Sequence, residues 1–591
     1  MLIHADLYPP AEKSTNNVNP PVVDFPASVR CPRRAGVHSS RQSLDDTPPR
    51  SNRKQRTMKR ITAILLLFVL FGGRGSAQIS DDALLDTLQH TAFNFFWTEA
   101  NPANGLIKDR SLSGAPCSIA STGFGLSAIC VGVDHGWVSR TAARDRILTA
   151  LKTFWNGPQG SGDAYIGNYG LFYHFLDMST ARRTWDSELS TIDTGLLLAG
   201  IVDARQYFDG SDSTETLLRA LADSIYHRMN WNLMRNYHPG ILMGWMPGHG
   251  FSYLDGANVV PYSEWIGYNE ASIMYILAMG TPTYPVDYSG WQKWTSGYSW
   301  QTQYGYSYVN FPPLFGHQYS QCWLDCRNVA DDYMRSRGIT YFENSRRAAL
   351  AQRAYCRANP GGFVGYSDSL WGITASDIPS GYGARGAPPA QGDDGTITPT
   401  APISSIAFAP DSVLPTIRNM WINYRTQLLT PSYGFRDAFN LSTTSPWYDT
   451  DVIGIDQGPI MLMIENYRTG RVWNRFMQNP DVQRGLAVAN FLPLTGVVSR
   501  IGLPLSFALR QNYPNPFNPT TNINFSLSGS GWVTLKVYDL LGRVTATLVE
   551  GTLPAGNHEV QFDGRRLSSG VYVYRLIAGG SAQSRTMMLL K

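Results

Sequence analysis

The chain has few charged residues and few cysteines for its length, and several widespread catalytic motifs do not occur in it. Of its 591 residues, 16% are charged and six are cysteines, too few and too widely spaced for a disulfide framework. The sequence has no Walker loop, dinucleotide-binding glycine pattern, nucleophile elbow or HExxH motif. Cys322 and Cys326 share a helical face, but no matching His/Cys pair accompanies them. We therefore expect neither a metal ion nor an organic cofactor.

The sequence also has little hydrophobic patterning at its start, except for one apolar run. Residues 1–57 are rich in Pro, Ser and Arg, which indicates a disordered extension or an over-called gene start. The run ITAILLLFVLF then follows a Lys-Arg pair and precedes Gly-Ser-Ala. The run is too short to span a membrane, so residues 58–77 are predicted to be an export signal peptide cut after Ala77.

Positive charge is scarce once this N-terminal part is set aside. Residues 1–77 hold 12 basic and 5 acidic side chains, so the remaining chain has 37 basic and 40 acidic ones. The formal net charge of +4 therefore becomes −3, and nothing favours a nucleic-acid partner. Aromatic residues are plentiful at 12%, which suits a surface that binds sugar rings but also a large core.

Helical segments of two kinds alternate between residues 78 and 492. Segments with one charged face cover residues 81–98, 140–156, 213–230, 344–358 and 411–426, and a weakly marked one is expected near 286–297. Segments with almost no charge after their first turn cover residues 118–133, 190–202, 270–280, 317–326, 401–409 and 458–467. A helix that is apolar all round is buried, whereas an amphipathic helix covers a core. The pattern predicts an (α/α)6 barrel, with an irregular helical solenoid as the alternative.

Carboxylates stand at the start of three of the uncharged segments. Asp193 lies in the first turn of one, Glu270 opens the next, and Asp456 precedes a Gly-Pro pair that indicates a helix start. Since the inner helices of such a barrel run parallel, these acids are expected to meet at one end. A single acid there is more often a helix cap than a catalyst. The additional Asp449 and Asp451 exceed what capping requires, which favours a functional cluster.

Carboxylates among aromatic side chains, without a metal motif, are typical of glycoside hydrolysis, in which one acid protonates the leaving oxygen and another activates water. The catalytic candidates are Glu270, Asp456 and Asp193. The candidate substrate contacts are Trp185, Glu188, Trp265, Tyr268, His317, Gln318, Asp449 and Asp451.

Several motifs between residues 81 and 491 resemble the glycoamylase-like domain. They are FNFFWTEANPANGLIKDR, ELSTIDTGLLLAGI, YNEASIMYILAMGTPTYP, PLFGHQYSQCWLDCR and IGIDQGPIMLMIENYRTG. This domain is similar to glycoside hydrolase family 144, whose members are endo-β-1,2-glucanases with an (α/α)6 barrel. The resemblance implies an inverting enzyme in which Glu270 and Asp456 match the essential acids and Asp193 matches a third functional acid.

The two principal acids are expected to differ in protonation. Glu270 follows Trp265 and Tyr268 in a poorly hydrated loop, where desolvation favours the neutral form that a general acid needs. Asp456 stands at a helix N-terminus, where the dipole and free N–H groups favour the ionised form of a base, whereas the neighbouring Asp449 and Asp451 favour the neutral form. Asp193 is either an alternative base or a ligand for substrate hydroxyls.

The C-terminal part of the sequence is a different unit. After a linker at 493–505, residues 506–591 contain short alternating segments such as WVTLKVYDL and VYVYRLIAG, which predict a small Ig-like all-β sandwich. By pattern alone this unit is a sugar-binding module or a spacer. NYPNPFNPTT, LKVYDLLGR, LSSGVYVYRL and the ending MMLLK resemble the type A C-terminal sorting domain of the type IX secretion system. The resemblance implies passage through the periplasm, then release or attachment at the outer-membrane surface.

The sequence thus predicts a secreted, monomeric glycoside hydrolase that cleaves a β-glucan, with the type IX secretion machinery as its other partner. An endo-β-1,2-glucanase is the first expectation. The alternatives are an exo-acting or glucoamylase-like hydrolase on another glucan, a polysaccharide lyase, and a surface glycan-binding protein without catalysis.

Overall fold

The computed structural model describes residues 79–494, 508–527, 531–553, 556–578 and 581–591. The predicted N-terminal extension, the predicted signal peptide and most of the predicted linker lie outside these residues. Among the described residues, no helix combines the length and apolar character that crossing a membrane requires. The chain is mainly helical from residue 81 to residue 488 and rich in β-strands from residue 508 onward.

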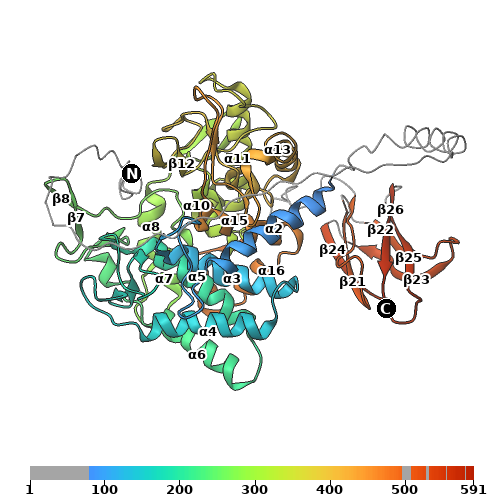
Figure 1. The fold of residues 1–591 in the computed structure, drawn as a ribbon, viewed down its shortest axis with the longest axis horizontal. Coiled ribbons are helices and arrows are strands. Elements are labelled where there is room, and N and C mark those ends of the chain that lie inside the picture. Colours follow the sequence, from blue (N-terminus) through green and yellow to red (C-terminus); the bar gives the residue numbers. More distant parts are fainter. Residues whose placement is uncertain (1–78, 495–507, 528–530, 554–555, 579–580) are drawn as a thin grey trace, which may run out of the picture. The chain divides into compact units, whose positions relative to one another are not determined.

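The longer helices are α2 (Asp81–Thr98), α3 (Ile119–Asp134), α4 (Arg140–Asn156), α5 (Thr191–Tyr207), α6 (Ser213–His227), α7 (Ser272–Gly280), α8 (Tyr288–Ser296), α11 (Tyr341–Ala358), α13 (Pro410–Asn423), α15 (Gly454–Arg468) and α17 (Pro480–Val488) (Figure 1). The shorter ones are η1 (Leu233–Arg235), α9 (Phe315–Gln318), η2 (Ser320–Cys322), α10 (Asp332–Ser336), α12 (Thr400–Ile403), α14 (Arg425–Leu428) and α16 (Arg471–Phe476).

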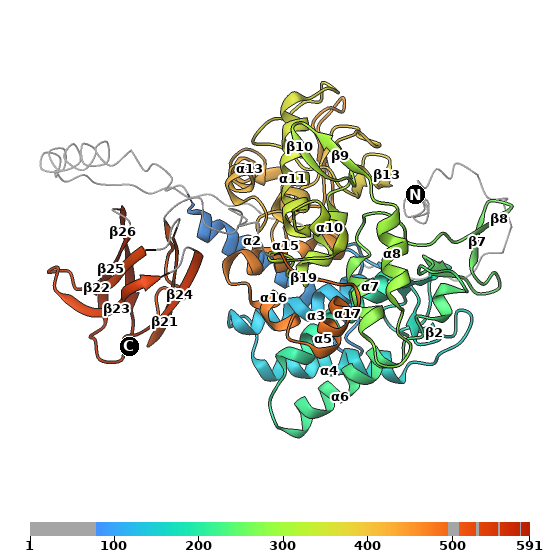
Figure 2. The same cartoon turned by 180° about the vertical axis from the view of Figure 1, so that it is seen from behind.

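The helices differ in burial as the sequence predicts. Almost every residue of α3, α5 and α7 is buried, because these helices carry small and apolar side chains on all faces. The helices α4 and α6 bury only one face, and Figures 1 and 2 both show them on the outer side of α3 and α5. The weakly marked helix is present as α8. The prediction that residues 78–492 are mainly helical is confirmed for the part of that range that the structure describes.

Two of the predicted buried helices are wrong in length. Helix is present at 315–318 and 320–322 where 317–326 was expected, and at 400–403 where 401–409 was expected. In the second case the serines compete for the backbone: the Ser405 hydroxyl donates to the Ala401 carbonyl oxygen at 2.9 Å. The helix α12 therefore ends before these serines, although the low charge of the segment predicts a longer helix.

Short antiparallel strands precede the buried helices. Those of the helical region are β1 (Cys117–Ser118), β2 (Gly167–Asn168), β3 (Leu171–Phe172), β4 (Phe175–Leu176), β5 (Leu189–Ser190), β6 (Gly244–Trp245), β7 (Ser252–Asp255), β8 (Asn258–Pro261), β9 (Trp300–Gln303), β10 (Tyr306–Val309), β11 (Val329–Ala330), β12 (Ser376–Ile378), β13 (Gly381–Gly383), β14 (Thr396–Ile397), β15 (Leu429–Thr430), β16 (Gly434–Phe435), β17 (Phe439–Asn440), β18 (Trp447–Tyr448) and β19 (Leu492–Pro493). β1 leads into α3, β5 into α5 and β14 into α12. The strand pairs therefore fix where the N-termini of these helices begin.

Helix α5 is held along its length by tight contacts. At Gly200 a Cβ atom would lie 1.9 Å from the carbonyl oxygen of Gly123 in α3, so only glycine permits this approach. Near its C-terminal end the fully buried Asp203 accepts two hydrogen bonds from the guanidinium of Arg475, at 2.7 and 2.8 Å. At its N-terminus Ser190 accepts from the backbone N–H of Asp193 and caps the helix.

The C-terminal region consists of two antiparallel sheets. Its strands are β20 (Ala508–Leu509), β21 (Thr520–Leu527), β22 (Gly531–Tyr538), β23 (Val544–Leu553), β24 (Gly556–Asp563), β25 (Gly570–Ala578) and β26 (Ser581–Leu589). They are ordered β20-β21-β24 in one sheet and β23-β22-β25-β26 in the other. Val533, Leu535 and Val537 are fully buried in the shared core, as the alternating pattern predicts. The Ig-like topology remains a prediction.

Candidate active site

Glu270 lies immediately before α7 and is 5% exposed. Its Oε2 atom has no hydrogen-bond partner among the described residues. No side chain caps α7; the neighbouring Asn269 instead fixes the preceding turn, where its side-chain oxygen accepts from the backbone N–H of Ala271 at 3.0 Å. Ser320 donates to the backbone carbonyl oxygen of Glu270 at 2.5 Å and holds the residue in place. The carboxyl group of Glu270 is thus positioned but has no capping role.

Burial gives Glu270 the acidity expected of a general acid. Loss of hydration, with a smaller contribution from the charge of Asp193, raises the pKa of Glu270 to about 7. The neutral and ionised forms are therefore both populated near neutral pH. The shift has the predicted direction and cause, because desolvation favours the neutral form of Glu270.

Asp456 lies in the first turn of α15, which begins at Gly454, earlier than the Gly-Pro pair suggests. Both of its side-chain oxygens are buried and accept no N–H or O–H hydrogen bond among the described residues apart from one that the neighbouring carboxyl group of Asp437 can donate, so Asp456 does not cap the helix either. The pKa of Asp456 is raised to about 7, chiefly by burial; a hydrogen bond with Asp437 opposes this shift, the charges of Asp377 and Asp109 add to it, and that of Arg110 opposes it. The prediction that the helix N-terminus keeps this carboxyl group ionised is therefore wrong.

Asp437 is the immediate partner of Asp456, and sequence reasoning missed it. Its pKa is well above the usual range because of burial and the charge of Asp456. Its Oδ2 accepts from the backbone N–H of Asp377 at 2.8 Å, but its Oδ1 has no donor among the described residues. A proton on Asp437 donated to Asp456 satisfies both groups and lowers the pKa of Asp456. Asp437 follows β16 in a loop, without the helix-start pattern that marks the other acids.

Asp377, Asp437 and Asp449 form a compact group in which one oxygen of each lies within 4.8 Å of the others. Burial and their mutual repulsion raise the pKa of Asp449 to about 8, and that of Asp377 is also raised, by burial. Asp449 therefore retains a proton at neutral pH, and the protonated forms of its two neighbours are favoured. Asp377 was also missed, since it lies in the strand β12.

Arg110 is the main counter-charge beside this group. Its guanidinium contacts Asp377 at 2.9 Å, Asp109 at 3.0 Å and Asp451 at 3.6 Å. Of the predicted acids, Asp451 therefore has an ion pair, whereas Asp449 has one buried oxygen with no partner among the described residues. The charge of Arg436 also lowers the pKa of Asp451, but the acids still outnumber these two arginines, which favours the protonated forms of the unpaired ones.

Glu270 and Asp456 are far apart in the sequence, but both influence the same buried tyrosine. Tyr319, between α9 and η2, is 5% exposed. Burial raises the pKa of its hydroxyl well above the usual range, and the charges of Asp456 and Glu270 add to that effect. The two carboxyl groups therefore act on the same hydroxyl, as expected for acids gathered at one end of the buried helices.

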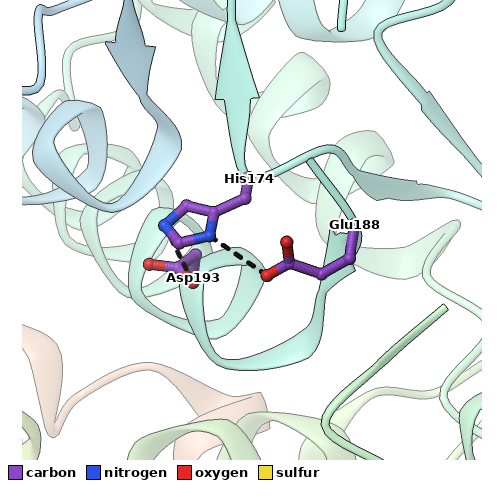
Figure 3. A group of neighbouring side chains, drawn as sticks. All are labelled: His174, Glu188 and Asp193. Atoms are coloured by element: carbon purple, nitrogen blue, oxygen red, sulfur yellow. Dashed lines mark hydrogen bonds and ion pairs between the residues drawn. The ribbon is translucent and has the colours of Figure 1, made fainter. Parts of the chain in front are cut away.

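A third group of charged side chains lies at the N-terminus of α5 (Figure 3). His174 Nδ1 lies 3.1 Å from Glu188 Oε1, and His174 Nε2 lies 3.5 Å from Asp193 Oδ2. Burial lowers the pKa of His174, but the charges of Asp193 and Glu188 outweigh it and raise the pKa to about 9. Both predicted acids are thus present in one cluster, whereas His174 was missed because a lone histidine in an apolar segment carries no pattern.

The predicted aromatic and polar contacts differ in exposure. Trp185 is 50% exposed and packs against Phe175 at a centroid distance of 5.1 Å. Trp265, Tyr268, His317 and Gln318 are buried with protein partners: for example, Trp265 donates to Thr191 and Gln318 donates to the Ala401 carbonyl oxygen. Burial lowers the pKa of His317 to about 3, so it is neutral. Trp185 therefore offers an open ring face, and the other four residues support the site from the core.

Comparison with known proteins identifies the class of both regions. Residues 262–480 match the glycoamylase family, described as "Putative glucoamylase", and residues 511–589 match the secretion system C-terminal sorting domain. A solved structure from Bacteroides uniformis with the same glucoamylase description is 34% identical, with a TM-score of 0.64, over 70% of this chain and 98% of that chain. The chain therefore belongs to the glycoamylase family and carries a sorting domain at its C-terminus.

Two relatives have names that state a substrate. An exo β-1,2-glucooligosaccharide sophorohydrolase of Parabacteroides distasonis is 32% identical over 445 residues, which are 69% of this chain and 58% of that protein. The chain thus spans less than two thirds of the length of this relative. The endo-β-1,2-glucanase of Chitinophaga pinensis, solved with sophorotriose and glucose, is 28% identical with a TM-score of 0.63, over 70% of this chain and 99% of that chain. These relatives are β-1,2-glucan hydrolases, which supports a glycosidase.

The buried carboxyl group of Glu270 predicts a characteristic effect on stability. Its pKa is higher in the folded chain (about 7) than in the unfolded chain (4.5), so the wild type loses stability as pH rises from 4.5 to 7. We expect Glu270→Gln to remove this loss, so that the variant gains roughly 1–3 kcal/mol relative to wild type between pH 5 and pH 8. Denaturant unfolding at both pH values measures the difference.

Glu465 provides a control of the opposite sign. It is equally buried, but a hydrogen bond and charge from His135 overcome the effect of burial and lower its pKa to about 2. Glu465→Gln removes stability that exists above pH 4.5 and is lost below it. If Glu270→Gln instead destabilises the protein equally at both pH values, Glu270 is a structural residue.

Proposed function

We propose that this protein is a secreted glycoside hydrolase that cleaves β-1,2-linked glucan. The observation that carries the proposal is that Glu270 and Asp456 are buried carboxyl groups, and that Oε2 of Glu270 and both side-chain oxygens of Asp456 lack a donor among the described residues other than a proton held by Asp437. Burying such groups costs stability, so they are retained for a partner that the chain itself does not supply. The names of the relatives support a β-1,2-glucan as that partner.

The proposed mechanism is inversion by a general acid and a general base. Glu270 donates its proton to the glycosidic oxygen as the bond from that oxygen to the anomeric carbon breaks. A water molecule attacks the anomeric carbon from the opposite face and passes its proton to Asp456, either directly or through a substrate hydroxyl. Asp437 regulates this base, because the proton that it donates to Asp456 keeps part of the Asp456 population ionised. Asp193 and Glu188 accept hydrogen bonds from sugar hydroxyls.

We also propose that the helices pair as an (α/α)6 barrel. The outer and inner partners are α2 with α3, α4 with α5, α6 with α7, α8 with α9, α11 with α12 and α13 with α15. The alternation of half-buried and buried helices supports this pairing. For the C-terminal region we propose an Ig-like sandwich, which the two antiparallel sheets with one core support.

The first test is the product profile on defined glucans. Purified protein is incubated with linear β-1,2-, β-1,3-, β-1,4- and α-1,4-glucans, and the products are separated by chromatography over time. An endo-acting enzyme gives a ladder of β-1,2-oligosaccharides from the first minutes. The sophorohydrolase relative favours a second candidate, an exo-acting enzyme, which releases disaccharide alone. An intact β-1,2-glucan after long incubation contradicts both, and tight binding without turnover identifies a glycan-binding protein.

The second test separates the two acids. We expect Glu270→Gln and Asp456→Asn each to lower turnover by roughly a hundredfold or more, the usual scale for losing a general acid or base. A substrate with a better leaving group needs no proton from the enzyme, so it restores turnover to Glu270→Gln but not to Asp456→Asn. Equal rescue of both variants would contradict the assignment of roles.

We further propose that the sorting domain takes a monomeric enzyme through the type IX secretion machinery, by way of the periplasm, to the medium or the outer-membrane surface. The match of residues 511–589 supports this localisation. We expect deletion of residues 506–591 to strand the enzyme in the periplasm of a secreting host with its specific activity unchanged. Fractionation followed by activity assays measures both. Lost affinity for glucan in the truncated protein favours a sugar-binding module instead.

A further inference from the structure

The cluster at the start of α5 places three ionisable side chains from three segments in one buried place. His174 comes from the chain between β3 and β4, Glu188 precedes β5, and Asp193 lies in the first turn of α5. All three are at most 4% exposed. One ligand-type atom of each lies within 4.8 Å of the others, with the imidazole ring between the two carboxyl groups (Figure 3).

Two carboxylates this close repel each other, and burial increases the cost. Without a cation, such a pair holds one shared proton, so one member becomes a hydrogen-bond donor. An imidazolium between them has an N–H directed to each side, and it removes the need for that proton. We propose that His174 is a positively charged positioning residue that holds Glu188 and Asp193 together as two carboxylates facing the substrate.

This inference rests on the proposed glucan hydrolase function and deepens it. Two carboxylates accept hydrogen bonds only, and the groups that a sugar presents to them are hydroxyl donors. A shared proton would take one of these acceptor positions away. The charge of Asp193 also raises the pKa of Glu270, so His174 influences the general acid through Asp193. His174 itself needs no contact with substrate.

The remaining charged groups around His174 are consistent with a cation at this place. Asp109 lies near enough for its charge to raise the pKa of His174. Tyr262 faces Glu188, whose charge raises the pKa of that hydroxyl. The guanidinium of the nearby Arg183 pairs with Asp163 and donates to the backbone oxygen of Ser187 at 2.6 Å. These contacts are not with the two carboxyl groups beside His174.

The decisive measurement is the titration of His174 by NMR in protein with isotope-labelled histidine, with the signal identified by its loss in His174→Gln. We expect a pKa of about 9. Glu188→Gln removes one of the two negative charges and should lower this pKa by about one unit or more. A value at or below 6.5 in wild-type protein overturns the proposal.

Stability against pH gives a second measurement. The pKa of His174 is about 9 in the folded chain and 6.5 in the unfolded chain, so its stabilisation is complete below pH 6.5 and is lost as pH rises to 9. His174→Gln should flatten the stability profile in this window. His317→Gln is the matched control, because burial keeps that equally buried imidazole neutral and its loss should leave the slope in this window unchanged. The proposal fails if both variants alter the slope alike.

Activity and metal analysis complete the test. We expect His174→Gln to lower kcat at least tenfold on β-1,2-glucan. The same three side chains offer ligands to a divalent cation, so elemental analysis of the purified protein and treatment with EDTA are included. If a bound metal is found and its removal abolishes activity, His174 is a metal ligand, and the proposal that it is a positively charged positioning residue is overturned. If wild-type protein cleaves no glucan, the proposed function fails, while the titration and stability data still decide the charge of His174.

Discussion

The cost of removing carboxyl groups from water governs this molecule. A carboxylate in bulk water is well hydrated, and each one that folding buries must gain a partner, keep a proton or raise the energy of the folded state. The helical region buries Asp193, Glu270 and Asp456 at the N-terminal ends of enclosed helices, and it buries other acids in the loops and strands beside them. The large apolar core therefore has a second role besides stability, because it provides the free energy that maintains an unfavourable group of acids.

The same type of side chain meets this cost in different ways within one site. Glu270 has no cation beside it and responds by holding a proton, whereas Asp456 shares one with Asp437. Asp451 pairs with the guanidinium of Arg110. The environment of each carboxyl group, rather than its residue type, thus sets its protonation state. Catalysis by paired acids requires such a difference in protonation.

More of the helix positions than of the site residues could be predicted from the sequence. Helix burial follows from local periodicity, and α2 and α4 have the predicted bounds because their charged faces are unambiguous. Asp193, Glu270 and Asp456 were identified because helix starts carry recognisable signals. Asp437 and His174 were missed, since they lie in loops and strands whose partners are distant in sequence. The protonation of Asp456 was mispredicted because a helix dipole is visible locally, whereas burial among other acids is a property of the whole fold.

The fixed position of α5 has an evolutionary consequence. This helix is attached near both ends, through Ser190 and through the Asp203–Arg475 pair, and Gly200 touches the backbone of α3 between them. A helix advances about 1.5 Å per residue, so Asp203 lies about 15 Å along the axis from Asp193. A substitution at Gly200 or Arg475 would move Asp193 without touching it. If Asp193 has the role in hydrolysis that we propose, natural selection on that role extends to residues at the far end of α5, which should diverge slowly among relatives although they touch no substrate.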